Sequence, residues 1–205
     1  MKKRMNTITI PILISGYIGS GKSTLAKKLA QTYHLPYISA STIHREIMNE
    51  KIAHEKGAKT KISNGFWETP AGKKAMALRM NNTLIDEEVD VRLLKELSKH
   101  PTSVTDARLM PWLYPKKAIR IWLTASEKAR ATRVGSRDNI SPTQAKKEIR
   151  ARLKKDIKLW KNIYGIPFGK DLKPFDLVLN NESFTKEETF DAVQAFLHDK
   201  TRRKN

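Results

Sequence analysis

The 205-residue sequence contains no cysteine, which excludes a disulfide framework and any metal site built on cysteine ligands. Long apolar runs are also missing, so no segment has the length needed to span a membrane as a helix. The short apolar stretch IPILIS near the N-terminus runs directly into a glycine-rich segment, and it predicts a buried strand rather than a signal peptide. We therefore expect an intracellular, cytoplasmic protein.

Acidic residues are scarce in the chain. It carries 40 Lys and Arg against 21 Asp and Glu, a formal net charge of +19. Such a charge favours polyanionic partners, namely nucleotides, nucleic acid or acidic membranes, and it says nothing about the fold. The sequence has no internal repeat, no linker to a second domain and no motif that interleaves aromatic and basic residues for RNA binding.

Apolar runs and amphipathic segments alternate along the chain. We expect five strands, at residues 12–15, 36–39, 103–105, 119–123 and 176–179. We expect helices at residues 23–33, 42–56, 71–99, 126–137 and 142–164 and from residue 186 onward, with an irregular connection over 59–70. Capping boxes are expected at Ser141–Gln144 and Thr185–Glu188. This alternation predicts an α/β fold with a parallel sheet flanked by helices.

The segment GYIGSGKST, between the first predicted strand and the first helix, fits the phosphate-loop pattern G-x-x-x-x-G-K-[ST]. A plain glycine turn is the alternative, but the strand before it and the amphipathic helix after it are the context that a phosphate loop needs. Glycine lets backbone N–H groups approach the phosphates, and the helix adds its positive N-terminal end. We expect the triphosphate to be bound by Gly16, Gly19, Ser20, Gly21, Lys22, Ser23 and Thr24.

The chemistry of this loop implies ATP and Mg²⁺. Lys22 would reach the β- and γ-phosphates, and the Ser23 hydroxyl would bind Mg²⁺. The loop alone leaves the phosphate acceptor open.

Clustered arginines follow the fourth predicted strand. Arg130, Arg133 and Arg137 fall on one face of a helix, and the next helix adds Arg150 and Arg152. A solvated basic face is the alternative. Arginine is, however, the side chain that binds phosphate through two parallel hydrogen bonds. The cluster therefore predicts a mobile flap that covers a transferring phosphoryl group and excludes water.

Polar residues near the ends of strands form the other candidate site. Asp106 and Arg108 follow the third predicted strand, where ligands bind in open α/β sheets. Asp106 would hold magnesium-bound water and Arg108 an acceptor phosphate, unless Asp106 merely caps the following turn. Arg45, after the second strand, would face the same cleft. Asp86 and Asp90, one helical turn apart, would bind a base or amine or else lie on a solvent face.

Taken in order, these segments resemble the cytidylate kinases, especially the short archaeal-type branch. The resemblance runs from residue 12 to about residue 196 and rests on ISGYIGSGKSTLAKKLA, ISASTIHREIMNE, LIDEEVD, TDARLMPWL, IRIWLTASEKARATRVGSRDNIS, NIYGIP and FDLVLN. It implies the P-loop fold of a nucleoside monophosphate kinase, with a five-stranded parallel core, a helical monophosphate-binding insert and an arginine-rich lid.

The resemblance also implies one kinase domain over residues 1–205, with a monomer as the family-typical state. The expected parts are a core at about 7–198, a monophosphate-binding region at about 40–100, a lid at about 133–160 and a polar tail at 199–205.

On the acceptor side, the resemblance assigns roles to four residues. Arg45 and Arg108 match arginines that hold the phosphate of the acceptor nucleotide, and Asp90 matches an acid that lines the monophosphate pocket. Asp106 matches the acid of the magnesium network, which makes Ser23 and Asp106 the expected metal ligands.

On the lid, Arg133 matches an arginine over the ATP base and Arg137 one that clamps phosphate. Arg150 and Arg152 lie where the family neutralises the transferring group. The catalytic residues that we expect are therefore Lys22, Arg133, Arg137, Arg150 and Arg152.

The sequence departs from the family pattern at several positions. Ser41 stands where glycine is usual, and Ala107 stands between Asp106 and Arg108 in place of glycine. Leu159-Trp160 replaces an Arg-Tyr pair, so one charge-neutralising arginine is missing, and Asp138 and Leu153 replace glutamates after lid arginines.

The activity implied is transfer of the ATP γ-phosphoryl group to CMP or dCMP, which needs no general base because the acceptor is already anionic. Two alternatives stay open. One is a P-loop kinase of a small-molecule hydroxyl, with Asp106 as base. The other is a nucleotide-gated RNA- or ribosome-associated protein, suggested by the +19 charge, which would also permit non-specific nucleic-acid binding as a side activity.

Overall fold

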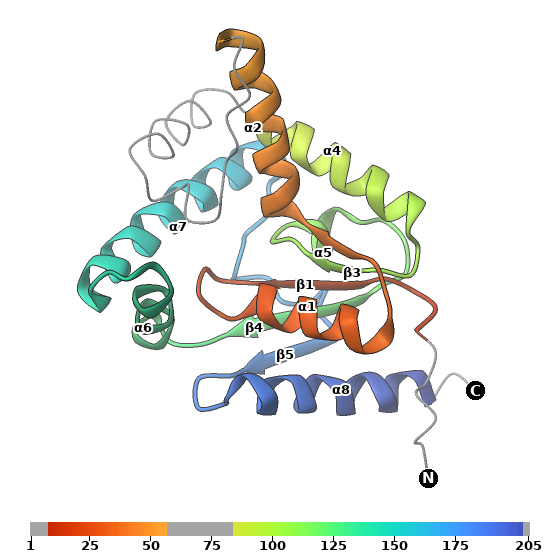
Figure 1. Ribbon diagram of the computed structural model, residues 1–205. Coiled ribbons are helices and arrows are strands. Elements are labelled where there is room, and N and C mark those ends of the chain that lie inside the picture. Colours follow the sequence, from red (N-terminus) through yellow and green to blue (C-terminus); the bar gives the residue numbers. More distant parts are fainter. Residues whose placement is uncertain (1–7, 57–83, 203–205) are drawn as a thin grey trace.

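The fold is built on a five-stranded, fully parallel sheet (Figure 1). The computed structural model describes residues 8–56 and 84–202. Along the sheet the strands are ordered β2-β3-β1-β4-β5. Their bounds are β1 Ile12–Gly16, β2 Tyr37–Ser39, β3 Val104–Asp106, β4 Ile119–Thr124 and β5 Leu177–Asn180. Every residue of the central strand β1 is buried, which explains why this part of the sequence is an unbroken apolar run.

Helices cover both faces of the sheet (Figure 1). They are α1 Lys22–Tyr33, α2 Ala40–Lys56, α4 Leu84–Lys99, α5 Met110–Leu113, α6 Glu127–Asp138, α7 Pro142–Tyr164 and α8 Lys186–Arg202. Strand side chains alternate between the two faces. Ile14 of β1 packs in one cluster with Leu29 of α1 and Val193 of α8, whereas Leu13 packs in another with Leu93 of α4. Within the described ranges, no helix is both long enough and apolar enough to cross a membrane.

The predicted parallel sheet is confirmed, and each strand differs from its predicted range by at most one residue at either end. The helix α5 was not predicted, because a single turn that contains a proline is too short to show helical periodicity. The predicted connection at 59–70 and the first part of the helix predicted at 71–99 lie outside the described residues. The described remainder is α4.

The two predicted capping boxes differ in the structure. At α8, the Glu188 amide donates to the Thr185 hydroxyl at 3.1 Å, and the Thr185 amide donates back to the Glu188 carboxylate at 2.7 Å. At α7, the Gln144 amide donates to the Ser141 hydroxyl at 3.1 Å, but the Gln144 side chain donates to Glu148 instead of closing the box. The box predicted at α7 is therefore only half formed, because the Gln144 side chain donates to Glu148 and does not accept from the Ser141 amide.

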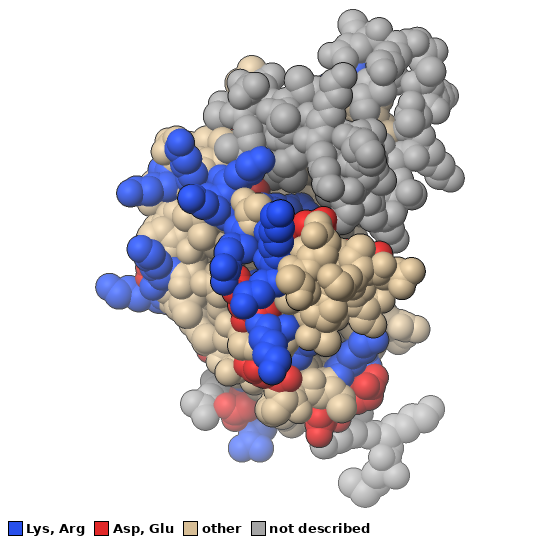
Figure 2. Space-filling view, turned by 90° about the vertical axis from the view of Figure 1, so that its left-hand side faces the viewer, with Lys and Arg blue, Asp and Glu red and all other residues tan. Residues whose placement is uncertain are grey.

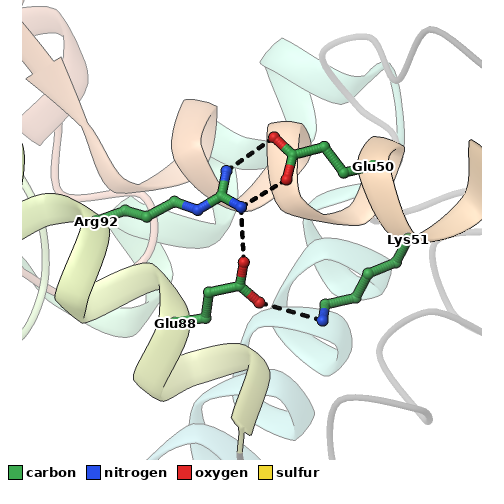
Figure 3. A network of polar contacts seen from close by, with 4 residues as sticks. All are labelled: Glu50, Lys51, Glu88 and Arg92. Carbon is green, nitrogen blue, oxygen red and sulfur yellow. Dashed lines mark hydrogen bonds and ion pairs between the residues drawn. The ribbon is translucent and has the colours of Figure 1, made fainter. Parts of the chain in front are cut away.

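A polar network joins α2 to α4 (Figure 3). The Arg92 guanidinium donates to both carboxylate oxygens of Glu50, at 2.8 and 2.5 Å, and to Glu88 at 2.7 Å. Lys51 completes the network with an ion pair to Glu88 at 3.1 Å. These hydrogen bonds to carboxylates raise the pKa of Arg92 above its usual range. The network links α2 to α4 through side chains that are partly exposed.

Candidate functional site

The loop between β1 and α1 has a shape that requires glycine at two positions. A Cβ added to Gly16, whose φ is 144°, would lie 2.1 Å from the carbonyl oxygen of Leu123 in β4. At Gly19, with φ 81°, it would lie 2.7 Å from the carbonyl oxygen of Arg130 in α6. Both distances are shorter than any real contact, and both φ values strain other residues. The glycines that we predicted for phosphate access therefore also allow β4 and α6 to pack directly on the loop.

Side chains from distant parts of the chain hold the carbonyl groups of this loop. Arg130 donates to the Ile18 carbonyl at 3.1 Å and lies over the ring of Tyr17, 4.9 Å from its centroid. The buried Asn181, just after β5, donates to the Ser20 carbonyl at 3.0 Å. Asn181 was not predicted, because its partner lies 161 residues away in the sequence.

Lys22 opens α1, and its amine donates to the Tyr17 carbonyl at 2.9 Å. Burial lowers the pKa of the Lys22 ammonium to about 8, and the negative charge of Asp106 only partly opposes this shift. The negative charge of a bound phosphate group would favour the charged ammonium form of Lys22. Lys22 therefore lies at the positive end of a helix as a cation that an anionic ligand would stabilise.

Ser23 and Asp106 meet beside Lys22. The Ser23 hydroxyl donates to the Asp106 carboxylate at 2.5 Å, and Asp106 is buried at the end of β3. The Tyr37 hydroxyl lies 3.5 Å from the same oxygen, and burial together with the charge of Asp106 raises the pKa of Tyr37 to about 12. A hydroxyl and a single carboxylate fit Mg²⁺, which takes oxygen ligands and leaves its other positions to water and phosphate.

The buried carboxylate of Asp156 contacts two arginines that we predicted to bind phosphate. One is Arg108 after β3, and the other is Arg152 on α7. Arg108, just after β3, donates to Asp156 of α7 at 2.5 Å, and Arg152 Nε lies 4.0 Å from the same oxygen. The Asp156 side chain is 0% exposed. Arg108 also stacks on Trp160, 4.5 Å from the ring centroid. Asp156 was not predicted, although its spacing from Arg152 is that of a helical ion pair.

The predicted lid arginines take up different positions. Arg133 donates to the side chain and carbonyl of Asn181, at 3.0 and 2.7 Å, and Arg137 forms a two-bonded pair with the adjacent Asp138 at 2.6 and 2.5 Å. Arg150 is exposed and donates to Glu127 at 2.9 and 2.5 Å. Arg150 therefore lies apart from the other predicted lid arginines.

The residues predicted to bind the acceptor lie on α2, on α4 and just after β3. Asp90 accepts a hydrogen bond from the hydroxyl of Tyr164 at 2.7 Å, a contact that the sequence analysis did not predict. Arg45 lies on α2 and donates to Thr42 at 3.1 Å. The cavity described next is bordered by His44 rather than by Arg45.

One cavity of about 830 Å³ brings most of these groups together. The predicted residues that line it are Gly19, Gly21, Lys22, Ser23, Thr24, Asp86, Asp90, Asp106, Arg108, Arg133, Arg137 and Arg152. Its volume lies in the range of small-molecule sites. Its lining combines the loop with Lys22, Arg108 just after β3 and the acids of α4. The cavity can therefore hold two anionic groups close to each other.

Two of the residues that depart from the family pattern, Ser41 and Ala107, also line this cavity. Ser41 lies in the first turn of α2, and its hydroxyl is 2.9 Å from that of Ser39. Leu159 is instead buried in an apolar cluster with Trp122 and Phe168. A packed leucine thus occupies the position where the family pattern has a lid arginine.

Comparisons with known proteins agree with this geometry. A sequence model of the cytidylate kinase-like family matches residues 11–183. A cytidylate kinase of Pyrococcus horikoshii is 33% identical over 184 residues, 90% of this chain and 86% of that protein. One of Sulfurisphaera tokodaii is 34% identical over 188 residues, 91% and 94% of the two chains. The shikimate kinase structure of Bacteroides thetaiotaomicron has a TM-score of 0.52 at 16% identity, covering 92% of this chain and 98% of that one, a likeness of fold alone.

Proposed function

This chain belongs to the cytidylate kinase-like family, and from that premise we propose that it transfers the γ-phosphoryl group of ATP to CMP or dCMP, giving CDP or dCDP. The observation that supports the proposal best is the single cavity lined by the phosphate loop, by Arg108 and by Asp90. In the proposed reaction Lys22 would bind one anionic group and Arg108 a second, as transfer between two phosphates requires.

On the donor side, we assign the triphosphate to the loop of residues 16–24, with Lys22 at the β- and γ-phosphates. The Ser23 hydroxyl and the Asp106 carboxylate would hold Mg²⁺, which supplies neutralisation of charge on the phosphates. Arg133 would lie over the ATP base. It donates to Asn181, whose side chain in turn donates to the Ser20 carbonyl of the loop.

On the acceptor side, Arg108 would hold the phosphate of the monophosphate, and Asp90 would face the rest of the nucleotide. Arg45 keeps its predicted role only if its side chain turns from Thr42 toward the cavity. Arg137 and Arg152 would neutralise the transferring group. Arg150 shares that predicted role only if it leaves Glu127. Catalysis then rests on positioning and on charge stabilisation.

The contact between Ser23 and Asp106 favours a phosphate acceptor over a hydroxyl acceptor. A hydroxyl acceptor needs a base, and Asp106 is the candidate, but its carboxylate is already engaged by Ser23 at 2.5 Å. An acceptor phosphate carries its own negative charge, so Asp106 can keep the metal-binding role proposed above. We also propose a monomer located in the cytoplasm, with the core, monophosphate-binding region and lid at the residues given above.

The proposal is tested with purified protein, Mg-ATP and a panel of CMP, dCMP, UMP, AMP and GMP. We expect ADP to form with CMP or dCMP much faster than with the purine monophosphates. Each reaction is compared with one that lacks acceptor, so that ATP hydrolysis is subtracted. Turnover that is equal for all five acceptors, or that appears only with hydroxyl acceptors, would contradict the proposal.

The affinity for ATP should fall as the pH rises through about 8. Lys22, whose pKa burial lowers to about 8, attracts phosphate only as the ammonium, so raising the pH removes the charge. We expect the Kd of Mg-ATP to rise about tenfold between about pH 7 and about pH 9. Calorimetric titration at constant ionic strength measures this. In the Lys22→Arg variant, whose guanidinium stays charged, most of the pH dependence should vanish, and an unchanged dependence would exclude Lys22 as its source.

A further inference from the structure

The exposed side of α7 carries a straight row of basic residues, which we call the α7 basic row: Lys147, Arg150, Lys154, Lys158 and Lys161. Their spacings of three, four, four and three residues match a helix of about 3.6 residues per turn, so they share one side of it. Figure 2 views the molecule from the side on which α6 and α7 lie, and blue side chains gather on that face.

The helix that carries the row is fixed by its opposite side. Its buried residues are Ala145, Ile149, Asp156, Leu159 and Trp160. They pack against α6 and against the aromatic cluster around Trp122. Since these positions lie across the helix from the row, all five basic side chains point to solvent from a rigid support. At about 1.5 Å per residue, the row is about 21 Å long.

Among the side chains that the structure describes, acids compensate little of the charge of the row. Between Pro142 and Tyr164, α7 has only two acids, of which Asp156 is buried against Arg108 and Glu148 accepts from Gln144. Arg150 pairs with Glu127, but the four lysines of the row form no ion pair with any of the described side chains, those of residues 8–51 and 84–202. They also lie away from the wall of the nucleotide cavity as the described residues form it. The proposed phosphoryl transfer therefore does not explain them.

A shallow hollow lies at the start of the row. Its volume is about 490 Å³, and it is lined by Thr143, Lys146, Lys147, Arg150, Ala151 and Lys154. Four of these six side chains are cationic, so the hollow suits a phosphate group. The lysines at positions 158 and 161 continue the positive charge beyond it along the same line.

We propose that the α7 basic row binds the phosphate backbone of nucleic acid without regard to sequence. A line of cations suits a polymer that carries regularly spaced negative charges. The row has no aromatic residue for stacking, so base recognition is not expected. An anionic membrane is the weaker candidate, because an interfacial helix needs apolar side chains to insert. The exposed large apolar residues of the described chain, Leu84, Val91, Val178 and Phe184, all lie outside α7.

The test compares two variants of equal charge in the full-length protein. The row variant is Lys147→Gln, Lys154→Gln, Lys158→Gln and Lys161→Gln. The control variant replaces four exposed lysines elsewhere, Lys95→Gln, Lys116→Gln, Lys117→Gln and Lys173→Gln. Glutamine has nearly the helix propensity of lysine, so both variants should fold, and thermal melting and kinase turnover check this. Fluorescence anisotropy then measures binding to a labelled single-stranded RNA of about 20 nucleotides.

We expect the row variant to bind this RNA at least tenfold more weakly than wild type at about 50 mM salt, and the control variant to lose less than about threefold. The slope of log Kd against log salt should fall by about 0.7 for each lost contact, or about 3 in all. Equal losses in the two variants would overturn the proposal, since net charge alone would then account for binding. So would the absence of RNA binding by wild type, or a row variant that loses binding only to vesicles with anionic lipid.

Discussion

Replacing Lys22 by alanine should lower kcat by at least about a hundredfold, the loss typical when one charge-stabilising group is removed from a transition state. Lys22 is the cation that the structure places at the mouth of the phosphate loop, with its amine held by the Tyr17 carbonyl. In the proposed reaction it stabilises charge that develops between the β- and γ-phosphates. Steady-state turnover with Mg-ATP and CMP measures the effect.

The matched control is Lys27→Ala on the same helix, an exposed lysine one and a half turns away. It changes the net charge equally and should leave kcat within about twofold of wild type, since surface substitutions have small effects. Thermal melting of both variants separates lost catalysis from lost folding. If Lys22→Ala turns over CMP as fast as wild type, Lys22 has no part in the transfer.

Replacing Asp156 by alanine should reduce both stability and acceptor binding. Its fully buried carboxylate accepts from Arg108 at 2.5 Å and lies 4.0 Å from Arg152, so its removal takes away a negative charge that both arginines share. We expect the free energy of unfolding to fall by about 3 kcal/mol. We also expect the KM for CMP to rise at least about tenfold, because Arg108 loses the group that orients it. Urea denaturation and initial rates measure the two effects.

A graded series makes this prediction specific. Asp156→Asn keeps an oxygen that can accept from Arg108 but removes the charge, so its effects should lie between those of wild type and Asp156→Ala. Asp191→Ala, on the exposed side of α8, is the control and should be nearly neutral. A normal KM for CMP in Asp156→Ala, with stability reduced, would give Asp156 a structural role alone.

The fold and the donor half of the site could be predicted because their signals are local. The phosphate loop is one continuous segment, and the strands are short apolar runs bounded by turns. Asp156 and Asn181 could not be predicted in this way. The hydrogen bond from Arg108 to Asp156 spans 48 positions, and that from Asn181 to Ser20 spans 161. Periodicity shows which side of a helix is buried, but it does not show which distant group lies there.

Contacts between distant parts of the chain also decide the position of Arg150. It was grouped with the lid arginines because it lies on the helix that follows them, but the packing of α6 against α7 decides where each side chain points. Arg152 turns toward Asp156, whereas Arg150, two residues earlier, turns outward to Glu127. Residues two apart on a helix lie on different sides of it, so only one of this pair can face the cavity.

The hydrogen bonds that side chains donate to the phosphate loop affect the entropy of ligand binding. The carbonyl groups of Tyr17, Ile18 and Ser20 accept hydrogen bonds from Lys22, Arg130 and Asn181, respectively. A flexible glycine-rich segment would lose conformational entropy when it closes around a ligand, at about 1–2 kcal/mol for each residue fixed. Here that ordering is complete once the chain has folded. A nucleotide therefore meets a site whose backbone is already arranged, and more of its interaction energy is retained as affinity.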